Sequence, residues 1–245
     1  MPRSPTRAVF TDLDDTLTTD SRIDPGTYAA LCRLSEKGIR LVVVSGRPAG
    51  WADCLMRLWP LDAMIFENGA GIMLREGKKI ATRHFADTES PERLRKIFSE
   101  LKSKVPELKP ATDQRFRIYD FAIDYREEPP RLDSEQLEKA MELLTNYDGI
   151  TFKLSSIHVN YWQGSHTKVT AVTRLLEEWK SDGIAPNDCV YCGDSPNDEP
   201  LFAHFDRSVG VANVKEYLGR MKFHPKFITT AHHGAGFQEL VQHLL

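Results

Sequence analysis

Short apolar runs alternate with longer amphipathic segments along most of the chain, and this alternation predicts an α/β protein. The run at 39–44 is almost entirely apolar, as expected of a strand buried on both faces of a parallel sheet. Further strands are predicted at 7–11, 64–66, 189–192, 208–211 and, at an edge, 226–228, with a hairpin over 71–74 and 79–83. Helices are predicted at 25–37, 48–58, 167–180, 200–205, 214–221 and 236–245. The pattern indicates a Rossmann-like, doubly wound parallel sheet.

The middle of the chain has a different pattern. Amphipathic helices are predicted at 90–105 and 134–147, and strands at 117–125, 150–154 and 157–162. The first of these strands alternates apolar and polar residues, which predicts one face in water. We therefore expect an inserted α+β domain at 85–162, which divides a core domain into 1–84 and 163–245.

Three aspartates follow the first strand directly, in the stretch FTDLDDTLT. If the chain is still extended there, Asp12 and Asp14 lie on one side of it. Two adjacent carboxylates without a basic partner are costly unless a cation lies between them, and Mg²⁺ prefers such hard oxygens. The alternative, an aspartate-rich turn in water, fits this stretch about equally well.

Two further positions suit the binding of a phosphate group. Ser45-Gly46 follows a buried strand and precedes a helix, where free backbone N–H groups attract anions; alternatively, the serine only caps the helix. Lys168 lies in the first turn of a predicted helix, where a cation opposes the helix dipole. This unfavourable placement indicates a functional role for Lys168, although an ordinary lysine on the surface is the common alternative.

A fourth group of polar residues ends the strand at 189–192, in the stretch GDSPND. Asp194 is placed to share a cation with Asp12, and Asn197 and Asp198 follow as a helix begins. Alone, this stretch could be a helix-capping turn. Together, all four groups lie at carboxyl ends of core strands, where doubly wound sheets bind ligands. They supply a nucleophile, an acid/base, a cation site and phosphate donors, the parts that phosphoryl transfer requires.

These four motifs, in this order, resemble those of the haloacid dehalogenase (HAD) superfamily. The resemblance implies that Asp12 is the nucleophile and Asp14 the general acid/base. The implied metal ligands are Asp12, Asp14 through its backbone carbonyl, Asp194 and Asp198, and Mg²⁺ is the implied cofactor. The implied phosphate-binding residues are Ser45, Gly46, Lys168 and Asn197. Many members have glycine at the position of Asp15.

The carboxylate at Asp14 favours a phosphatase or a phosphomutase, because a dehalogenase needs no proton for its leaving group. The position of the insert, and the stretch Phe66–Ala70, resemble subfamily IIB with its C2-type caps, the Cof-type phosphatases. Within it the chain is most similar to mannosyl-3-phosphoglycerate and sucrose-phosphate phosphatases, which implies a phosphorylated sugar or a related metabolite as substrate. The rival hypotheses are a phosphomutase and a non-catalytic binding protein on the same scaffold.

Selectivity for the substrate is expected to reside in the inserted domain and its surroundings. Candidate residues are Arg47, Asn68, Arg115, Arg117, Lys153, His158, Asn160, Gln163 and His166. For most of them, an ordinary surface role is the simpler interpretation.

Composition and charge argue against several kinds of partner and site. The net charge of −3 gives no reason to expect nucleic acid or a membrane surface as partner. No apolar run approaches the roughly 20 residues of a membrane span, so we expect a cytoplasmic monomer or homodimer that binds a small phosphorylated metabolite. The spacing Cys189-x-x-Cys192 is that of some metal and redox sites, but side chains three apart on a strand point oppositely. We therefore predict two core cysteines.

Overall fold

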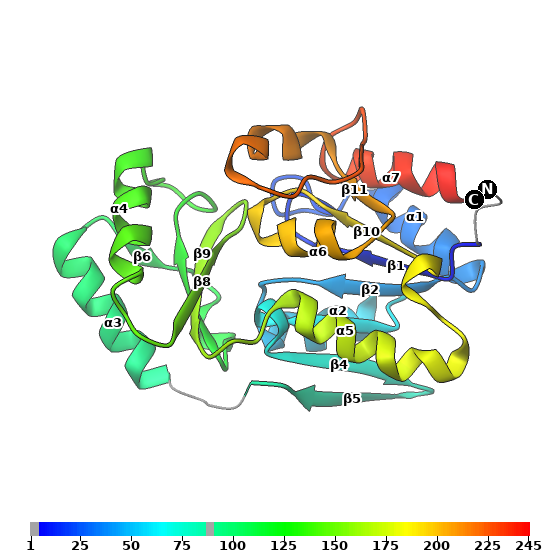
Figure 1. Ribbon diagram of the computed structural model, residues 1–245, viewed down its shortest axis with the longest axis horizontal. Coiled ribbons are helices and arrows are strands. Elements are labelled where there is room, and N and C mark those ends of the chain that lie inside the picture. Colours follow the sequence, from blue (N-terminus) through cyan, green and yellow to red (C-terminus); the bar gives the residue numbers. More distant parts are fainter. Residues whose placement is uncertain (1–4, 87–90) are drawn as a thin grey trace.

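Strand β1 (Ala8–Thr11) lies at the centre of the larger sheet because its side chains are apolar towards both faces. Val9 packs into one hydrophobic cluster, and Phe10 packs into the other. The computed structural model describes residues 5–86 and 91–245. Their strands form an eight-stranded sheet and a four-stranded sheet (Figure 1).

The larger sheet has the order β12-β11-β10-β1-β2-β3-β4-β5. Its other strands are β2 (Arg40–Val44), β3 (Ala63–Phe66), β4 (Gly71–Glu76), β5 (Lys79–His84), β10 (Cys189–Gly193), β11 (Ser208–Gly210) and β12 (Phe227–Ile228). The pairs β3–β4 and β4–β5 are antiparallel, and all other neighbours pair in parallel. Strands β4 and β5 form the predicted hairpin. The predicted Rossmann-like core and its edge strand are confirmed.

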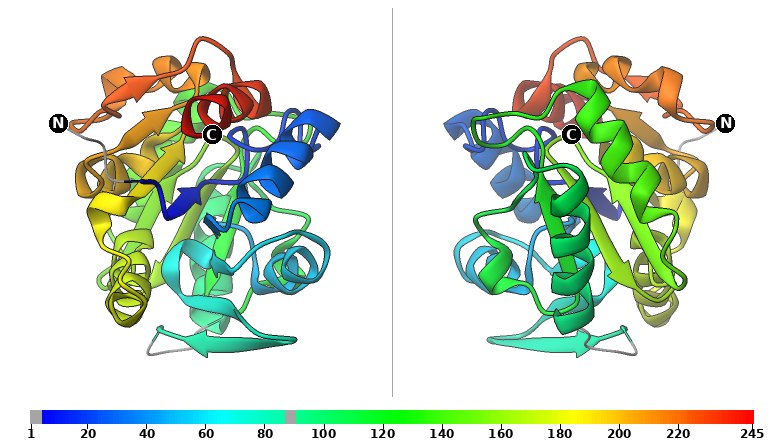
Figure 2. Two further views of the ribbon diagram at one scale, coloured as in Figure 1. Left: turned by 90° about the vertical axis from the view of Figure 1, so that its right-hand side faces the viewer. Right: turned by 90° about the vertical axis from the view of Figure 1, so that its left-hand side faces the viewer.

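Helices cover both faces of this sheet (Figure 2). One face carries α1 (Pro25–Glu36), α2 (Ala49–Leu58) and α7 (His233–Leu244), and the other carries α5 (Lys168–Trp179) and α6 (Glu199–His204). Local signals set the ends of α1: Asp24 accepts a hydrogen bond from the Thr27 N–H, and Gly38 follows the helix with a φ of 72°. No helix in the described ranges is long and apolar enough to cross a membrane.

Two details of the core differ from the prediction. The segment predicted as a helix at 214–221 forms two short 3₁₀ turns, Ala212–Glu216 and Leu218–Arg220. Gly219 interrupts the helical pattern there and lowers its helix propensity. The last helix begins at His233, earlier than predicted, and Asn213 Oδ1 accepts a hydrogen bond from its backbone N–H.

The two cysteines of β10 behave as expected. Cys189 belongs to the cluster on the α5 side of the sheet, whereas Cys192 belongs to the cluster on the α1 side. All four cysteines of the chain are free thiols. The spacing of three residues therefore places two small side chains in two different cores, as predicted.

The smaller sheet belongs to the middle of the chain and has the order β6-β7-β9-β8. Its strands are β6 (Lys109–Pro110), which was not predicted, β7 (Asp120–Asp124), β8 (Ile150–Leu154) and β9 (His158–Gln163). Helices α3 (Pro91–Lys104) and α4 (Ser134–Leu144) pack on one face through a third hydrophobic cluster. We call this unit the cap; its limits at 85–162 stay a prediction. Ser90, the predicted start of its first helix, lies outside the described residues.

The strand predicted at 117–125 is shorter than expected and has no exposed face. It covers Asp120–Asp124, and all five residues are buried. A 3₁₀ turn, Gln114–Phe116, precedes it. Its polar side chains are covered because this face of the cap sheet lies against the core. The alternation of polar and apolar residues cannot distinguish a face covered in this way from one exposed to water.

Burial of the helices on the sheet predicts a measurable contrast between two leucines. Leu31 in α1 is fully buried, whereas Leu58 at the end of α2 is 66% exposed. We expect Leu31→Ala to lower the free energy of unfolding by about 2–5 kcal/mol. Leu58→Ala should change it by less than about 0.5 kcal/mol. Denaturant titration of both variants checks this, and equal losses would contradict the assigned packing.

Candidate active site

The motifs predicted to carry the chemistry meet at the carboxyl ends of the central strands of the large sheet. Asp12 follows β1, Ser45 follows β2 and Asp194 follows β10. Because β1 lies between β2 and β10 in parallel register, these three positions are neighbours. The backbone N–H of Asp12 continues the ladder and donates to the carbonyl oxygen of Cys192 at 2.8 Å.

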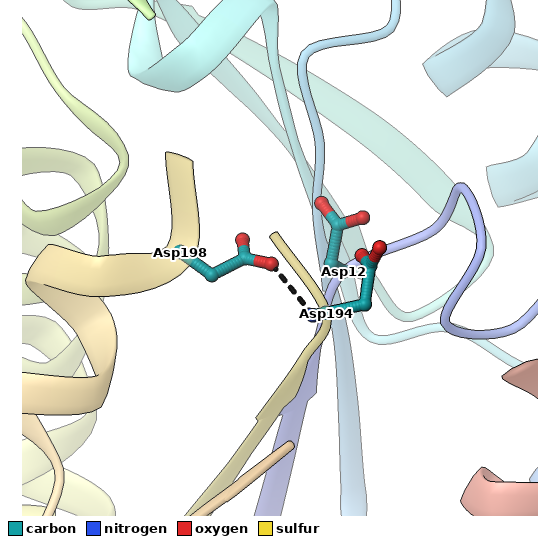
Figure 3. Close-up of side chains that lie close together, drawn as sticks. All are labelled: Asp12, Asp194 and Asp198. Carbon is teal, nitrogen blue, oxygen red and sulfur yellow. Dashed lines mark hydrogen bonds between the residues drawn. The ribbon is translucent and has the colours of Figure 1, made fainter. Parts of the chain in front are cut away.

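Three carboxylates form a buried cluster there (Figure 3). Asp12 is 4% exposed, and Asp194 and Asp198 are fully buried. One oxygen of each lies within 4.8 Å of one oxygen of the others. Burial raises the pKa of Asp12 and of Asp194 well above the usual range, and the neighbouring carboxylates raise both further. The site thus concentrates negative charge away from water.

Lys168 supplies one cation to this cluster. The helix α5 begins at Lys168 because Thr167 caps it, accepting a hydrogen bond from the Thr170 N–H. The ammonium donates to Asp12 Oδ1 at 2.6 Å and to Asp198 Oδ1 at 2.7 Å. Burial alone would lower the lysine pKa, but these two carboxylates raise it above its usual value. Ionised, the three carboxylates and one ammonium carry two excess negative charges, which matches a divalent cation with oxygen ligands.

The oxygens of Asp198 are fully engaged. Oδ1 accepts from Lys168 and from the Tyr191 hydroxyl at 2.6 Å. Oδ2 accepts from the backbone N–H groups of Asp194 and Ser195, at 2.9 and 3.2 Å. Asp198 therefore ties the lysine, β10 and the following turn together.

The side chains of Asp12 and Asp194 accept fewer hydrogen bonds than that of Asp198. Oδ2 of Asp12 accepts no hydrogen bond from any residue within 5–86 or 91–245, while its Oδ1 is held by Lys168. Asp194 accepts one bond on each oxygen, from the Thr16 hydroxyl at 3.0 Å and from Asn213 Nδ2 at 3.3 Å. Lone pairs on both carboxylates remain available to a cation or a substrate.

Asp14 faces Arg47 instead of the acidic cluster. The guanidinium binds both Asp14 oxygens, with Nε at 2.9 and 3.0 Å and Nη2 at 2.8 Å. Its remaining donors reach two cap carboxylates, Asp113 at 3.0 Å and Glu127 at 2.5 Å. Arg47 is only 2% exposed, and three carboxylates share its five N–H donors. This residue joins the core motif to the cap.

Asp15 has a positive φ of 57°, a conformation that glycine adopts most readily. Its carboxylate is hydrogen-bonded by Ser156 of the cap. His233 Nδ1 donates to its carbonyl oxygen at 3.1 Å. Burial raises the pKa of Asp15, and the Ser156 hydrogen bond partly opposes that effect. The side chain thus serves as a contact between core and cap.

The predicted phosphate-binding residues lie around the carboxyl ends of the same strands. The Ser45 hydroxyl accepts from the Arg47 N–H at 3.0 Å and does not cap α2, whose N-cap is Pro48. The alternative interpretation of Ser45 as a helix cap is therefore wrong. Asn197 is buried and accepts from the Ser195 hydroxyl at 2.9 Å.

Several predicted specificity residues are occupied in holding the cap on the core. Arg117 is buried between Asp113 and Asp120, at 3.0 and 2.9 Å, and also donates to the Gly46 carbonyl at 2.8 Å. Asn160 donates to Asp120 at 2.9 Å and to the same carbonyl at 3.4 Å. Asn68 donates to Asp120 at 3.5 Å. His158 lies 2.8 Å from Glu127.

The remaining candidates lie elsewhere in the cap or in the segment that leads from it to α5. The Arg115 guanidinium covers the Phe116 ring at 4.7 Å. Gln163 pairs with Ile150 at the far end of β9, and the His166 ring stacks on Trp162 at 5.3 Å. Lys153 lies opposite Asn160 in the sheet.

Sequence reasoning missed the acidic residues that hold the cap: Asp113, Asp120, Glu127 and Glu67. The fully buried Glu67 carboxylate accepts the N–H groups of Ala49 at 3.1 Å and Tyr119 at 2.6 Å, among others. Burial, together with the nearby Asp120 carboxylate, raises the pKa of Glu67 to about 7, although the N–H groups of Tyr119 and Ile118 oppose this shift. The Asn-Gly pair after Glu67 signals an unusual backbone, and Glu67 does adopt a φ of 46°. For Glu127 no signal exists, since Arg-Glu-Glu-Pro-Pro is typical of an exposed loop.

Comparison with known proteins agrees with this arrangement. The model of the sucrose-6F-phosphate phosphohydrolase family matches residues 5–244. The phosphoglycolate phosphatase of Methanopyrus kandleri is 24% identical over 98% of this chain and 97% of its own. Sucrose-phosphatase 2 of Nicotiana tabacum is 31% identical, over 61% of this chain but only 36% of that protein.

A solved structure shows the same fold. The haloacid dehalogenase-like hydrolase from Bacteroides thetaiotaomicron aligns with a TM-score of 0.69 at 19% identity, over 98% of this chain and 100% of that one. The family match covers both sheets and all four motifs. The chain therefore belongs to the sucrose-6F-phosphate phosphohydrolase family, and with it to the HAD superfamily of phosphatases.

Proposed function

We propose that the chain hydrolyses a small phosphomonoester in a Mg²⁺-dependent reaction, with a phosphoryl group carried transiently on Asp12. One observation carries this proposal: Asp12 has one oxygen held by Lys168 and the other without a hydrogen-bond partner among the described residues, inside a cluster with two excess negative charges. A carboxylate oriented in this way can act as a nucleophile.

The cation site is best assigned to Asp12, Asp194 and the backbone carbonyl of Asp14. Asp198 already accepts four hydrogen bonds, so we assign it to orienting Lys168 and the turn after β10. A bound Mg²⁺ offsets the negative charge of the site and so lets an anionic nucleophile approach an anionic phosphate.

Two steps complete the reaction. In the first, Asp12 Oδ2 attacks phosphorus, the ester bond to the leaving oxygen breaks, and that oxygen takes a proton from the Asp14 carboxyl group. In the second, water gives a proton to Asp14 and attacks the same phosphorus, which releases inorganic phosphate and restores Asp12. Because Asp14 must face the leaving group, its contacts with Arg47 have to rearrange when substrate enters.

The phosphate oxygens are assigned to donors that converge on the sheet edge. The Lys168 ammonium is already there, and the Ser45 hydroxyl and the Gly46 N–H lie at the end of β2. The Asn197 amide follows β10 in the turn Pro196–Asp198. Fixed donors of this kind stabilise the charge that develops on the transferred group.

The substrate is proposed to be a phosphorylated sugar or a related metabolite such as a glycosylated phosphoglycerate. Relatives named for phosphoglycolate and sucrose phosphate support a small organic phosphomonoester. A phosphomutase would need free cations to hold a bisphosphate, but Arg47 and Arg117 are both engaged by carboxylates. Release of free phosphate, without a bisphosphate activator, distinguishes the two activities.

Removing the nucleophile tests the chemistry. Asp12→Asn keeps the shape of the side chain, and we expect it to lower kcat by at least about 10³-fold without loss of folding. Phosphate release and circular dichroism measure the two effects. Asp206→Asn, at a carboxylate that is 75% exposed, serves as the control and should keep full activity. Substantial turnover by Asp12→Asn would disprove the role of Asp12.

Cation binding has a readout that does not depend on turnover. At a Mg²⁺ concentration ten times its Kd, we expect the folded protein to gain about 1.4 kcal/mol, because the cation binds only the folded state. For a chain of this size that raises Tm by about 3–6 °C. Asp194→Asn should lose the shift and Asp206→Asn should keep it. An unchanged shift in Asp194→Asn would contradict the assigned site.

Tyr191 is proposed as a positioning residue, because its hydroxyl holds the oxygen of Asp198 that also binds Lys168. Tyr191→Phe removes one hydrogen bond, and we expect kcat to fall about 2–10-fold with KM unchanged. Tyr28→Phe is the matched control, since the Tyr28 hydroxyl is exposed and, among the described residues, hydrogen-bonds only to the Leu58 backbone carbonyl. A change confined to KM, or none, would rule out this role.

A further inference from the structure

The cap sheet presents one polar face to the core. In an antiparallel sheet, residues directly opposite each other lie on the same face. Asn160 lies opposite Ala122 and Lys153, and it reaches the Gly46 carbonyl in the core. The residues in register on this face are Asp120, Ala122, Asp124, Thr151, Lys153, His158, Asn160 and Trp162.

Most cations around this face are already neutralised. Arg117 is paired with Asp113 and Asp120, and Lys109 with Asp124 at 3.1 Å. Arg47 is shared by Asp14, Asp113 and Glu127, as described above. Each of these three cations is already paired with a carboxylate, so none is free to bind an anionic substrate.

Lys153 is different. Its ammonium makes no ion pair or hydrogen bond with any residue of the described ranges, although the side chain is partly buried. It lies on the face that meets the core, opposite Asn160. Its ammonium is therefore a cation beside the core that no carboxylate of the described ranges neutralises.

The strand that carries Lys153, β8, lies beside the proposed phosphate site. Lys153 lies three residues before Ser156, which hydrogen-bonds the Asp15 carboxylate from the tip of the β8–β9 hairpin. At about 3.3 Å per residue, three residues span about 10 Å. The strand β8 also lies against the turn Pro196–Asp198, which holds the proposed phosphate ligand Asn197.

We propose that Lys153 binds a second anionic group of the substrate, and that this group is a carboxylate on the alcohol that leaves. The inference rests on the proposed phosphatase function and narrows its substrate to the phosphate ester of a hydroxy acid, with or without an attached sugar. One ammonium balances one carboxylate, whereas a second phosphate would bring extra negative charge close to Asp113 and Glu127.

Two compounds of nearly equal size test the proposal: 3-phosphoglycerate, which has a carboxylate, and glycerol 3-phosphate, which has a hydroxymethyl group instead. Their Kd values are measured by calorimetry with Mg²⁺ on the Asp12→Asn protein, so that no turnover disturbs the titration. A charge-assisted hydrogen bond predicts that the carboxylate compound binds about 10–100-fold more tightly.

Adding Lys153→Met should reduce that preference to within about threefold, by weakening 3-phosphoglycerate alone. Lys153→Arg should keep most of it. Lys139→Met removes an exposed lysine of α4, on the opposite side of the cap sheet, and should leave both Kd values unchanged.

Equal binding of the two compounds before the lysine is changed would overturn the proposal, as would failure to bind either. An equal loss for both compounds in Lys153→Met would also overturn it, because the lysine would then be acting on the shared phosphate. The proposed function is tested separately, by Mg²⁺-dependent phosphate release from an aryl phosphate by the unmodified protein. Failure of that assay is therefore distinguishable from failure of the Lys153 assignment.

Discussion

The buried contact of one ammonium with two carboxylates is the interaction on which the rest of the site depends. Lys168 reaches Asp12 and Asp198 at 2.6 and 2.7 Å, and thereby joins the start of α5 to the ends of β1 and β10. The strands β1 and β10 are far apart in sequence but adjacent in the sheet, and α5 packs on one face of it. Because the ammonium balances only part of the charge, the ionised cluster is costly to bury, and a divalent cation at the proposed site would offset the remaining charge. The same unbalanced charge that makes the site costly to bury makes it suited to phosphoryl transfer.

A second cation, Arg47, extends this balance into the cap. Its bonds to Asp14 on one side and to Asp113 and Glu127 on the other link the proposed acid/base directly to the domain that covers the site. Breaking such a buried contact by removing one partner leaves a charge uncompensated. In the proposed mechanism, entry of a substrate, movement of Asp14 and the position of the cap are therefore coupled through Arg47. Such coupling would give the cap a part in the chemistry as well as in selectivity.

The core could be predicted from the sequence because its signals are local. Apolar strands followed at once by Asp12, Ser45 and Asp194 indicate both the sheet and the edge where these residues meet. The cap could be predicted only as a set of elements. The polar residues of β7 alternate as they would in water, and only tertiary contacts bury them. Asp120 has a partner in the core, Asn68, whereas the partners of Asp124 among the described residues, such as Lys109, belong to the cap. From the sequence, Arg47 and Arg117 are expected to bind substrate. In the structure both are paired with carboxylates, and no local pattern in the sequence identifies these partners.

The central claim, that Asp12 carries the phosphoryl group, is tested most directly by trapping the intermediate. The protein is mixed with Mg²⁺ and a substrate bearing radiolabelled phosphate, quenched with acid within the first turnover, and digested for peptide mapping. We expect the label on the peptide that contains Phe10–Thr16, and we expect none in Asp12→Asn. Label on a different peptide, or a full turnover of phosphate release with no labelled protein at any time, would contradict the account.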